Sequence, residues 1–132
     1  MIVLDTHALL WWASGDAKLS AAAQQRIEQE LQGDGLLAIS SISAWEIAML
    51  VAHGRLTLTM AVDDWLETVA RIEGVRFIPV DNHLAVASTQ LPDPFHKDPA
   101  DRLIVALARQ LNALLITADS KLQHYPHVHT LW

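Results

Sequence analysis

Residues 98–108 read Asp98-Pro99-Ala100-Asp101-Arg102-Leu103-Ile104-Val105-Ala106-Leu107-Ala108. Two carboxylates stand three positions apart, and an apolar run follows them. The pattern predicts a buried helix that begins at Pro99, because proline suits the first helical position and aspartate is a good N-cap. One interpretation is therefore purely structural, with Asp98 as the cap and Asp101 completing a capping box. The acids elsewhere in the chain favour a second interpretation.

Strand-like and helix-like patterns alternate along the whole chain. We predict strands at 2–4, 36–39, 75–80 and 114–117, with a short one near 128–130. We predict helices at 6–12, 20–31, 44–51, 62–70, 82–90 and 99–112, with a helical turn at 120–123. Pro79 favours an edge position or a strand end for the third strand. The alternation predicts an α/β fold in which helices cover both faces of a parallel sheet.

Composition limits the classes of protein to consider. The 132 residues have the size of one domain, which we expect to span 1–132, and 52% of them are hydrophobic. The chain has no cysteine, no secretion signal and no apolar segment long enough to span a membrane, which favours a cytoplasmic protein without a membrane partner. Its net charge of -6 argues against a nucleic-acid binder, unless a bound divalent metal supplies the missing positive charge.

Four acids stand at corresponding places beside the predicted strands. Asp5 follows the first strand and Asp119 the fourth, while Glu46 and Asp101 lie early in the helices after the second strand and before the fourth. Because ligands of open parallel sheets gather at the carboxyl ends of the strands, these acids are expected to converge. Their mutual repulsion requires protons or a cation, and Mg²⁺ or Mn²⁺ is the natural partner of carboxylates. Such a site suits phosphoryl chemistry.

Each acid also has a structural interpretation. Asp5 and Asp119 are placed to cap the helices that follow them, and Glu46 is placed to complete a capping box with Ser43. Taken singly, capping is the better explanation for each acid. Taken together, their corresponding positions favour a metal site.

Four motifs extend the argument: Val3-Leu4-Asp5-Thr6, Ser43-Ala44-Trp45-Glu46-Ile47, His96-Lys97-Asp98-Pro99-Ala100-Asp101-Arg102-Leu103-Ile104 and Ile116-Thr117-Ala118-Asp119. In this order and spacing the chain resembles PIN-domain ribonucleases, and more closely the VapC-type toxins of bacterial toxin–antitoxin pairs. The resemblance covers nearly the whole chain. It implies a three-layer α/β/α fold around a mainly parallel sheet of four to five strands. It also implies a Mg²⁺- or Mn²⁺-dependent endoribonuclease that leaves a 5′-phosphate on RNA, a homodimer, and inhibition by a cognate antitoxin.

The resemblance assigns metal binding and catalysis to Asp5, Glu46, Asp101 and Asp119. Asp98 is a further candidate metal ligand, because the third motif of this subfamily contains two acids. Asp101 is preferred over it because it leads the apolar helix as the family acid does.

The candidate substrate-binding residues are Thr6, Ser43, His96, Lys97 and Arg102. Thr6 and Ser43 either line the site or support the starts of helices. The three basic residues either position phosphate or belong to a solvated loop, in which Arg102 forms an ion pair with an acid of the same motif, Asp98.

We expect the tryptophans to contribute mainly to the structure rather than to the chemistry. Trp45 is expected in the core rather than as a platform for base stacking. Trp11 and Trp12 point about 100° apart on a helix, so one is expected in the core and the other at the surface, where it is available to an amphipathic antitoxin helix. Surface positions are expected for His7, His124, His127 and His129.

The main alternative to a nuclease is a PIN-fold interaction module that binds no metal and catalyses nothing. Aspartyl-phosphate enzymes also combine acids with a parallel sheet. A phosphatase of the haloacid-dehalogenase type requires Asp-x-Asp at the first strand, where this chain has Asp5-Thr6-His7. A receiver domain requires an acidic pair ahead of its phosphorylated aspartate, and the order of acids here fits poorly.

Overall fold

A five-stranded parallel sheet forms the centre of the computed structural model, which describes residues 1–132. The strand order is β3-β2-β1-β4-β5, and every neighbouring pair is parallel. The strands are β1 (Ile2–Leu4), β2 (Leu37–Ser40), β3 (Val75–Ile78), β4 (Leu114–Ile116) and β5 (Thr130–Leu131). The predicted α/β class with a parallel sheet is confirmed.

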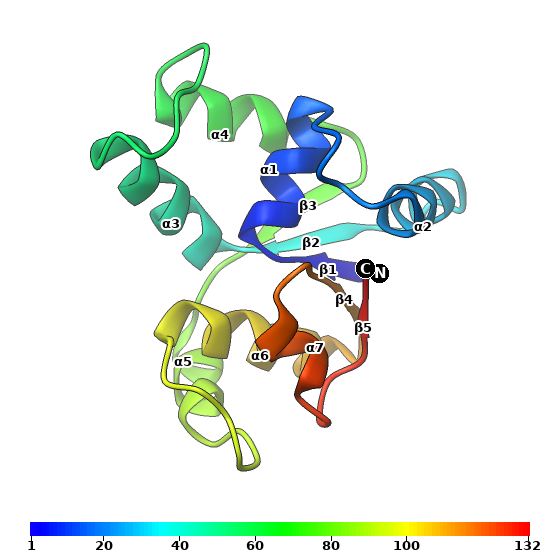
Figure 1. Ribbon diagram of the computed structural model, residues 1–132, viewed down its shortest axis with the longest axis vertical. Helices are drawn as coiled ribbons and strands as arrows, with labels where there is room; N and C mark the ends of the chain where they lie inside the picture. Colours follow the sequence, from blue (N-terminus) through cyan, green and yellow to red (C-terminus); the bar gives the residue numbers. More distant parts are fainter.

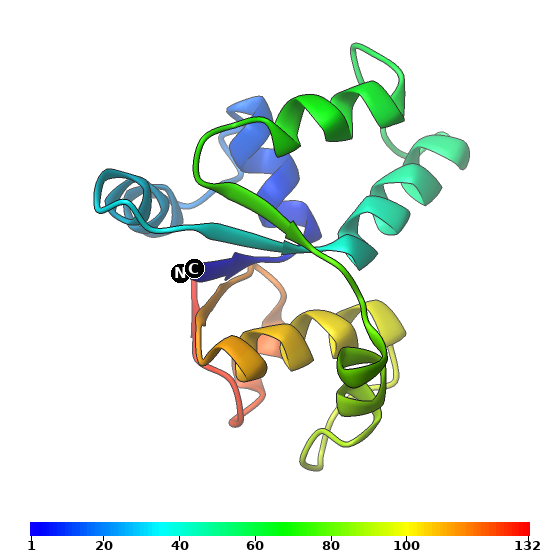
Figure 2. The same cartoon turned by 180° about the vertical axis from the view of Figure 1, so that it is seen from behind.

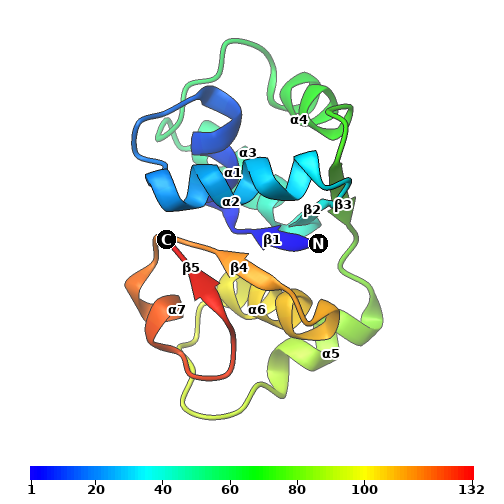
Figure 3. The same ribbon diagram turned by 90° about the vertical axis from the view of Figure 1, so that its right-hand side faces the viewer.

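Helices cover both faces of this sheet. They are α1 (Thr6–Ser14), α2 (Ala21–Gln32), α3 (Ser41–Ala52), α4 (Val62–Ala70), α5 (Asn82–Thr89), α6 (Pro99–Leu111) and α7 (Ser120–His124). Figures 1 and 3 show α1 to α4 on one side of the sheet and α5 to α7 on the other. The expected three-layer α/β/α arrangement is therefore confirmed.

The alternation of side chains along each strand divides the core into two clusters. Ile2, Leu4 and Ile116 face the cluster formed with α1 to α4, whereas Val3 and Leu115 face the cluster formed with α5 to α7. Successive strand residues point to opposite faces, so a strand buried on both sides must be apolar throughout. This is why the strands appear in the sequence as continuous apolar runs.

The path of the chain creates a crevice beside β1. The chain builds β2 and β3 outward on one side of β1, then returns to place β4 on its other side; Figure 2 shows the long return through α5 and α6. The connections that leave β1 and β4 diverge here, and in open α/β sheets such a reversal of strand order opens a binding crevice at the carboxyl ends of the strands.

Several element boundaries differ from the prediction. The third strand ends at Ile78, directly before Pro79, and β3 is an edge strand, as the proline indicated. Helix α3 begins at Ser41 instead of Ala44, because the Ser40 hydroxyl caps it by accepting from the backbone N–H of Ile42. None of the helices combines the length and the apolar character needed to cross a membrane.

Two predictions about tryptophans were wrong. Trp45 is 57% exposed and belongs to neither core cluster. Trp11 and Trp12 are both partly buried against the cluster beneath α1, rather than one in the core and one at the surface.

Candidate active site

A cavity of about 420 Å³ opens at the crevice beside β1, and five carboxylates line it. We call it the acidic cavity, and its lining residues are Asp5, Thr6, His7, Trp11, Glu46, Asp98, Asp101, Ile104, Ala118 and Asp119. The carboxylates arrive from four separate parts of the chain. The predicted convergence of distant acids at the carboxyl ends of the strands is what the structure shows.

Three of the aspartates cap helices and still line the cavity. The Oδ1 atoms of Asp5, Asp98 and Asp119 accept hydrogen bonds from backbone N–H groups in the first turns of α1, α6 and α7, at 2.9, 3.0 and 2.8 Å. Capping uses one carboxylate oxygen and fixes the side chain. The second oxygen of Asp98 and of Asp119 makes no hydrogen bond within the protein. The capping and the chemical interpretations are therefore compatible at these positions.

A chain of buried hydroxyls fixes Glu46. The Thr6 hydroxyl donates to Glu46 Oε1 at 2.5 Å and lies 2.8 Å from the Ser43 hydroxyl. Since Thr6 has a single hydroxyl proton and gives it to Glu46, Ser43 is the donor in the second contact. The proposed capping box between Ser43 and Glu46 was wrong, because both side chains turn toward Thr6.

His96 holds Asp101 in place, although His96 itself does not line the acidic cavity. The Nε2 atom of His96 lies 2.7 Å from Asp101 Oδ2, and both side chains are 22% exposed. The His96 ring stacks on Phe95, with 4.4 Å between the ring centroids. Asp101 therefore does not complete a capping box, since its carboxylate pairs with histidine.

Arg102 supports the loop before α6 rather than the cavity. Its guanidinium donates to the backbone carbonyls of Ser88, Phe95 and His96 and lies over the Phe95 ring. The alternative of an ion pair with Asp98 was wrong. Lys97 is exposed, and neither basic residue lines the acidic cavity.

Burial and mutual repulsion disfavour the charged forms of these acids. Burial raises the pKa of Asp5, Glu46 and Asp101 above the ordinary carboxyl values, and repulsion by neighbouring carboxylates adds to the effect on each pKa. No lysine or arginine lines the cavity. A cation bound among these acids would remove both penalties at once.

The donor set fits a hydrated divalent ion. All five carboxylates are hard oxygen ligands of the kind that Mg²⁺ and Mn²⁺ prefer. No three His, Asp or Glu side chains are grouped closely enough to enclose a bare ion. Mg²⁺ usually keeps several waters and uses one or two carboxylates, so a partly open set of this kind suits it.

Four residues of the lining were not among the candidate site residues: His7, Trp11, Ile104 and Ala118. His7 is exposed, as expected, but also lines the acidic cavity, and Trp11 lies beside it with 5.6 Å between the ring centroids. His7 follows Asp5 and Thr6 at the start of α1, so its place directly after the first motif was the available signal.

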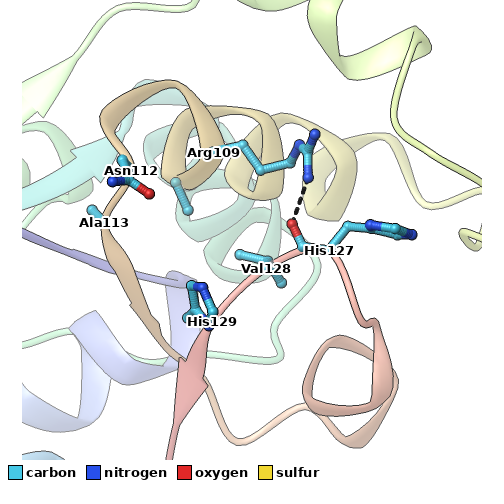
Figure 4. A pocket seen from close by; sticks show the side chains of 7 residues that line it. Arg109, Asn112, Ala113, His127, Val128 and His129 are labelled. Carbon is cyan, nitrogen blue, oxygen red and sulfur yellow. Dashed lines mark hydrogen bonds between the residues drawn. The ribbon is translucent and has the colours of Figure 1, made fainter.

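A second hollow of about 310 Å³ lies at the other end of α6, where no carboxylate lines it. Arg109 donates to the carbonyl of His127 at 2.6 Å, and Figure 4 shows the rings of His127 and His129 pointing away from one another. This hollow lacks a convergent set of reactive groups, so the acidic cavity is the candidate active site.

Comparison with known proteins agrees with this geometry. The family model described as "PIN domain" matches residues 2–128. The chain belongs to the PIN domain family. Ribonuclease VapC22 of Mycobacterium tuberculosis is 36% identical over 133 aligned positions, which cover 99% of this chain and 98% of that protein.

Solved structures with the same PIN domain fold include toxin–antitoxin complexes. VapBC2 from Rickettsia felis, bound to a DNA fragment from its promoter, matches with a TM-score of 0.68 and 18% identity, covering 99% of this chain and 98% of that one. A toxin–antitoxin complex from Klebsiella pneumoniae matches with a TM-score of 0.64 and 20% identity, covering 97% and 95%. At these identities the likeness concerns the fold alone.

Proposed function

We propose that this PIN domain protein is an endoribonuclease that uses Mg²⁺ or Mn²⁺ to hydrolyse RNA phosphodiester bonds at the acidic cavity. The observation that carries the proposal is the meeting of Asp5, Glu46, Asp101 and Asp119 at the carboxyl ends of β1 and β4. The 36% identity to a ribonuclease over nearly the full length of both chains supports RNA as the substrate.

In this proposal Asp5, Glu46, Asp101 and Asp119 would together hold a hydrated metal ion, with one or two of them as direct ligands, and Asp98 is a further candidate ligand. When bound, the ion supplies Lewis-acid polarisation of the phosphate and lowers the pKa of water. The protein keeps its acids oriented before substrate arrives, because helix caps, Thr6 and His96 each fix a carboxylate. Thr6, Ser43 and His96 therefore act through these acids, and direct phosphate contacts by Lys97 and Arg102 are not part of the proposal.

Cleavage of total RNA by the purified protein tests this function. Wild-type protein should cut RNA with Mg²⁺ or Mn²⁺ and lose activity in EDTA. Asp5→Asn should lower the rate by more than about 100-fold, because it removes a buried ligand at the centre of the cavity. The matched control is Asp64→Asn, which changes an exposed aspartate on α4.

Two outcomes would reject the nuclease. Cleavage that persists in EDTA or in Asp5→Asn would come from a contaminant or from another site. Absence of cleavage, together with calorimetry that detects no Mn²⁺ binding sensitive to Asp5→Asn, would favour the interaction module instead.

We also propose that the protein is the toxin of a toxin–antitoxin pair, in the cytoplasm, and that an antitoxin helix docks beside the acidic cavity. A groove of about 460 Å³ adjoins the cavity and shares His7 and Trp11 with it. Its apolar lining is Leu10, Trp11, Leu50, Leu56, Leu58 and Trp65. An amphipathic helix with apolar anchors fits such a groove, and a basic side chain at its end would reach the acids. The likeness in fold to toxin–antitoxin complexes supports this partner.

Expression in bacteria tests the toxin role. Wild-type protein should stop growth, Asp5→Asn should not, and co-expression of its cognate antitoxin should restore growth. Leu58→Asp should keep RNA cleavage but escape this rescue, because it puts a charge into the groove. Rescue of Leu58→Asp as complete as that of wild type would contradict this docking surface.

The family resemblance further supports a homodimer. Sedimentation velocity of the antitoxin-free protein should give a dimer at micromolar concentration, and a monomer at all concentrations would contradict it.

A further inference from the structure

Trp45 is the one aromatic side chain that the fold leaves outside its core. The other four tryptophans pack against the core beneath α1, and the two phenylalanines and Tyr125 also belong to one of the two clusters. Trp45 is 57% exposed, although a buried position would remove its large apolar surface from water. The fold therefore gives no structural reason for a tryptophan here.

An apolar hollow of about 390 Å³ lies against this ring. Ile42 and Trp45 line it from α3, and Pro99 and Ala100 line it from the start of α6. Its remaining lining residues are Glu46 and Asp98, which also line the acidic cavity. Trp45 directly precedes Glu46, and consecutive helical residues point about 100° apart. The Trp45 ring is therefore beside the acids and not among them.

We propose that Trp45 is a stacking platform for an unpaired RNA base next to the phosphate that is cut. The proposal rests on the proposed function and identifies the substrate as single-stranded RNA or a loop. A nucleotide combines an anionic phosphate with an uncharged aromatic base. The two adjoining hollows match these two parts, since one is suited to a charged group and the other is apolar. The acidic cavity with its cation takes the phosphate, and the apolar hollow takes the base.

The charge of the protein favours this occupant. The net charge is -6, and neither hollow is lined by lysine or arginine, so phosphate contacts away from the metal contribute little attraction. Single-stranded nucleic acid can bind through base stacking on aromatic side chains, which tolerates any sequence. A base inside an A-form duplex is already stacked on its neighbours and is not available to Trp45.

The test uses four octamers: oligouridylate, oligoadenylate, a fully paired RNA duplex, and a phosphodiester with eight phosphates but no bases. Trp45→Ala should raise KM for the two single strands by about 10- to 100-fold, the range expected for one base stack, with a smaller change in kcat. Trp45→Phe and Trp45→Tyr should recover most of the loss. The matched control is Val86→Ala, which trims another exposed apolar side chain, on α5.

Binding supplies a second readout that does not require cleavage. With cutting blocked by Asp119→Asn, oligouridylate should quench tryptophan fluorescence, and Trp45→Phe should remove most of that quenching, leaving only the part that comes from Trp11 in the acidic cavity. The parent protein should bind the baseless phosphodiester more weakly than oligouridylate. The Trp45→Ala variant should bind both ligands equally weakly, because removing the bases and removing the Trp45 ring delete the same contact. Because Trp45 is exposed, the melting temperature should change by no more than about 2 °C.

The outcomes separate the two proposals. Activity in EDTA or in Asp5→Asn would overturn the nuclease itself. Loss of activity in Asp5→Asn, combined with an unchanged KM and unchanged quenching in the Trp45 variants, would overturn only the stacking platform. If Trp45→Ala changed the sedimentation coefficient or antitoxin rescue while RNA affinity stayed the same, the ring would cover a protein interface, which also overturns it.

Discussion

A single buried hydroxyl determines how Glu46 is presented. Thr6 is 4% exposed and Ser43 is fully buried, so neither side chain has water as an alternative partner. The proton donated by Thr6 keeps the Glu46 carboxylate turned toward the acidic cavity, and Ser43 completes the chain of hydrogen bonds. Side chains that hydrogen-bond to a metal ligand in this way hold the ligand in place without touching the metal.

Thr6→Val should therefore weaken metal use while keeping the shape of the side chain. We expect a roughly 10- to 100-fold loss in activity, seen mainly as a higher Mg²⁺ concentration at half-maximal rate. The unpaired Ser43 hydroxyl should also lower the free energy of unfolding by about 1–3 kcal/mol. Mg²⁺ titrations of cleavage measure the first effect and urea unfolding the second. Thr6→Ser keeps the hydroxyl and should behave like wild type; equal damage by both changes would contradict the role of the hydroxyl.

The acids were predictable as single residues, whereas Trp45 was not. Each acid stands at a strand end or in an early turn of a helix, which the sequence displays. Helix α3 carries apolar residues on every side, so its pattern does not indicate which face is buried. Only the packing of α3 against its neighbours decides that Trp45 faces outward.

At the scale of elements, Arg102 ties α6 to the segment before it through three hydrogen bonds. Arg102 donates to three backbone carbonyls between Ser88 and His96, and these carbonyls have no equivalent partner without it. The loop in turn carries His96 to Asp101. Arg102 therefore stabilises the fold and positions the candidate site together.

Arg102→Met keeps the length of the side chain but removes its donors. We expect the free energy of unfolding to fall by about 1–3 kcal/mol and cleavage to fall with it, because His96 loses its support. Chemical denaturation and steady-state cleavage measure the two effects. The matched control, Arg109→Met, loses one exposed hydrogen bond to the His127 carbonyl and should change stability by less than about 0.5 kcal/mol. Similar stability of the two variants would contradict this account.

The start of α3 shows why some element boundaries could not be predicted from the sequence. Ser40, Ser41 and Ser43 are all good N-caps, so local preference does not choose between them. The contact between Ser43 and Thr6 decides where the helix begins, because it requires Ser43 to lie inside the first turn and to face α1. The helix at 62–70, which has an amphipathic pattern of its own, and the helix at 82–90, which Asp81 caps, were predicted within one residue.

At the scale of the whole molecule, the strand order brings the acids together. The alternation of strands and helices predicted a parallel sheet, but not that β1 would lie between β2 and β4. This order depends on contacts between distant segments, which no local pattern records. The positions of the acids beside the strands predicted that they converge, and the family resemblance added that Asp5, Glu46, Asp101 and Asp119 share one metal site.

The gathered acids should make the metal-free protein more stable in mild acid. The pKa values of Asp5, Glu46 and Asp101 are raised in the fold above the ordinary values of 3.8 for aspartate and 4.5 for glutamate, so the folded state binds protons more tightly than the unfolded chain. Their contribution to stability is therefore fully present below the unfolded pKa values and is lost as pH rises through the raised folded values.

Melting temperatures in EDTA should rise as the pH falls from 7 toward the ordinary pKa values of these carboxyls. Asp101→Asn should raise the melting temperature at pH 7 and flatten its dependence on pH, since it removes one of the repelling charges. Adding Mn²⁺ at pH 7 should stabilise wild type more than Asp101→Asn. Glu28→Gln, an exposed change on α2, is the control. A melting temperature that is independent of pH and of Mn²⁺ would contradict the repulsion among these acids.

The position of β4 between β1 and β5 has a consequence for synthesis on the ribosome. Asp101 and Asp119 belong to the last third of the chain, and β1 has no neighbour on one edge until residues 114–116 have emerged. Before that third is made, the chain carries Asp5 and Glu46 without Asp101 and Asp119, so the acidic cavity is incomplete. We therefore expect RNA cleavage only from a chain that has been synthesised through β4 and α7.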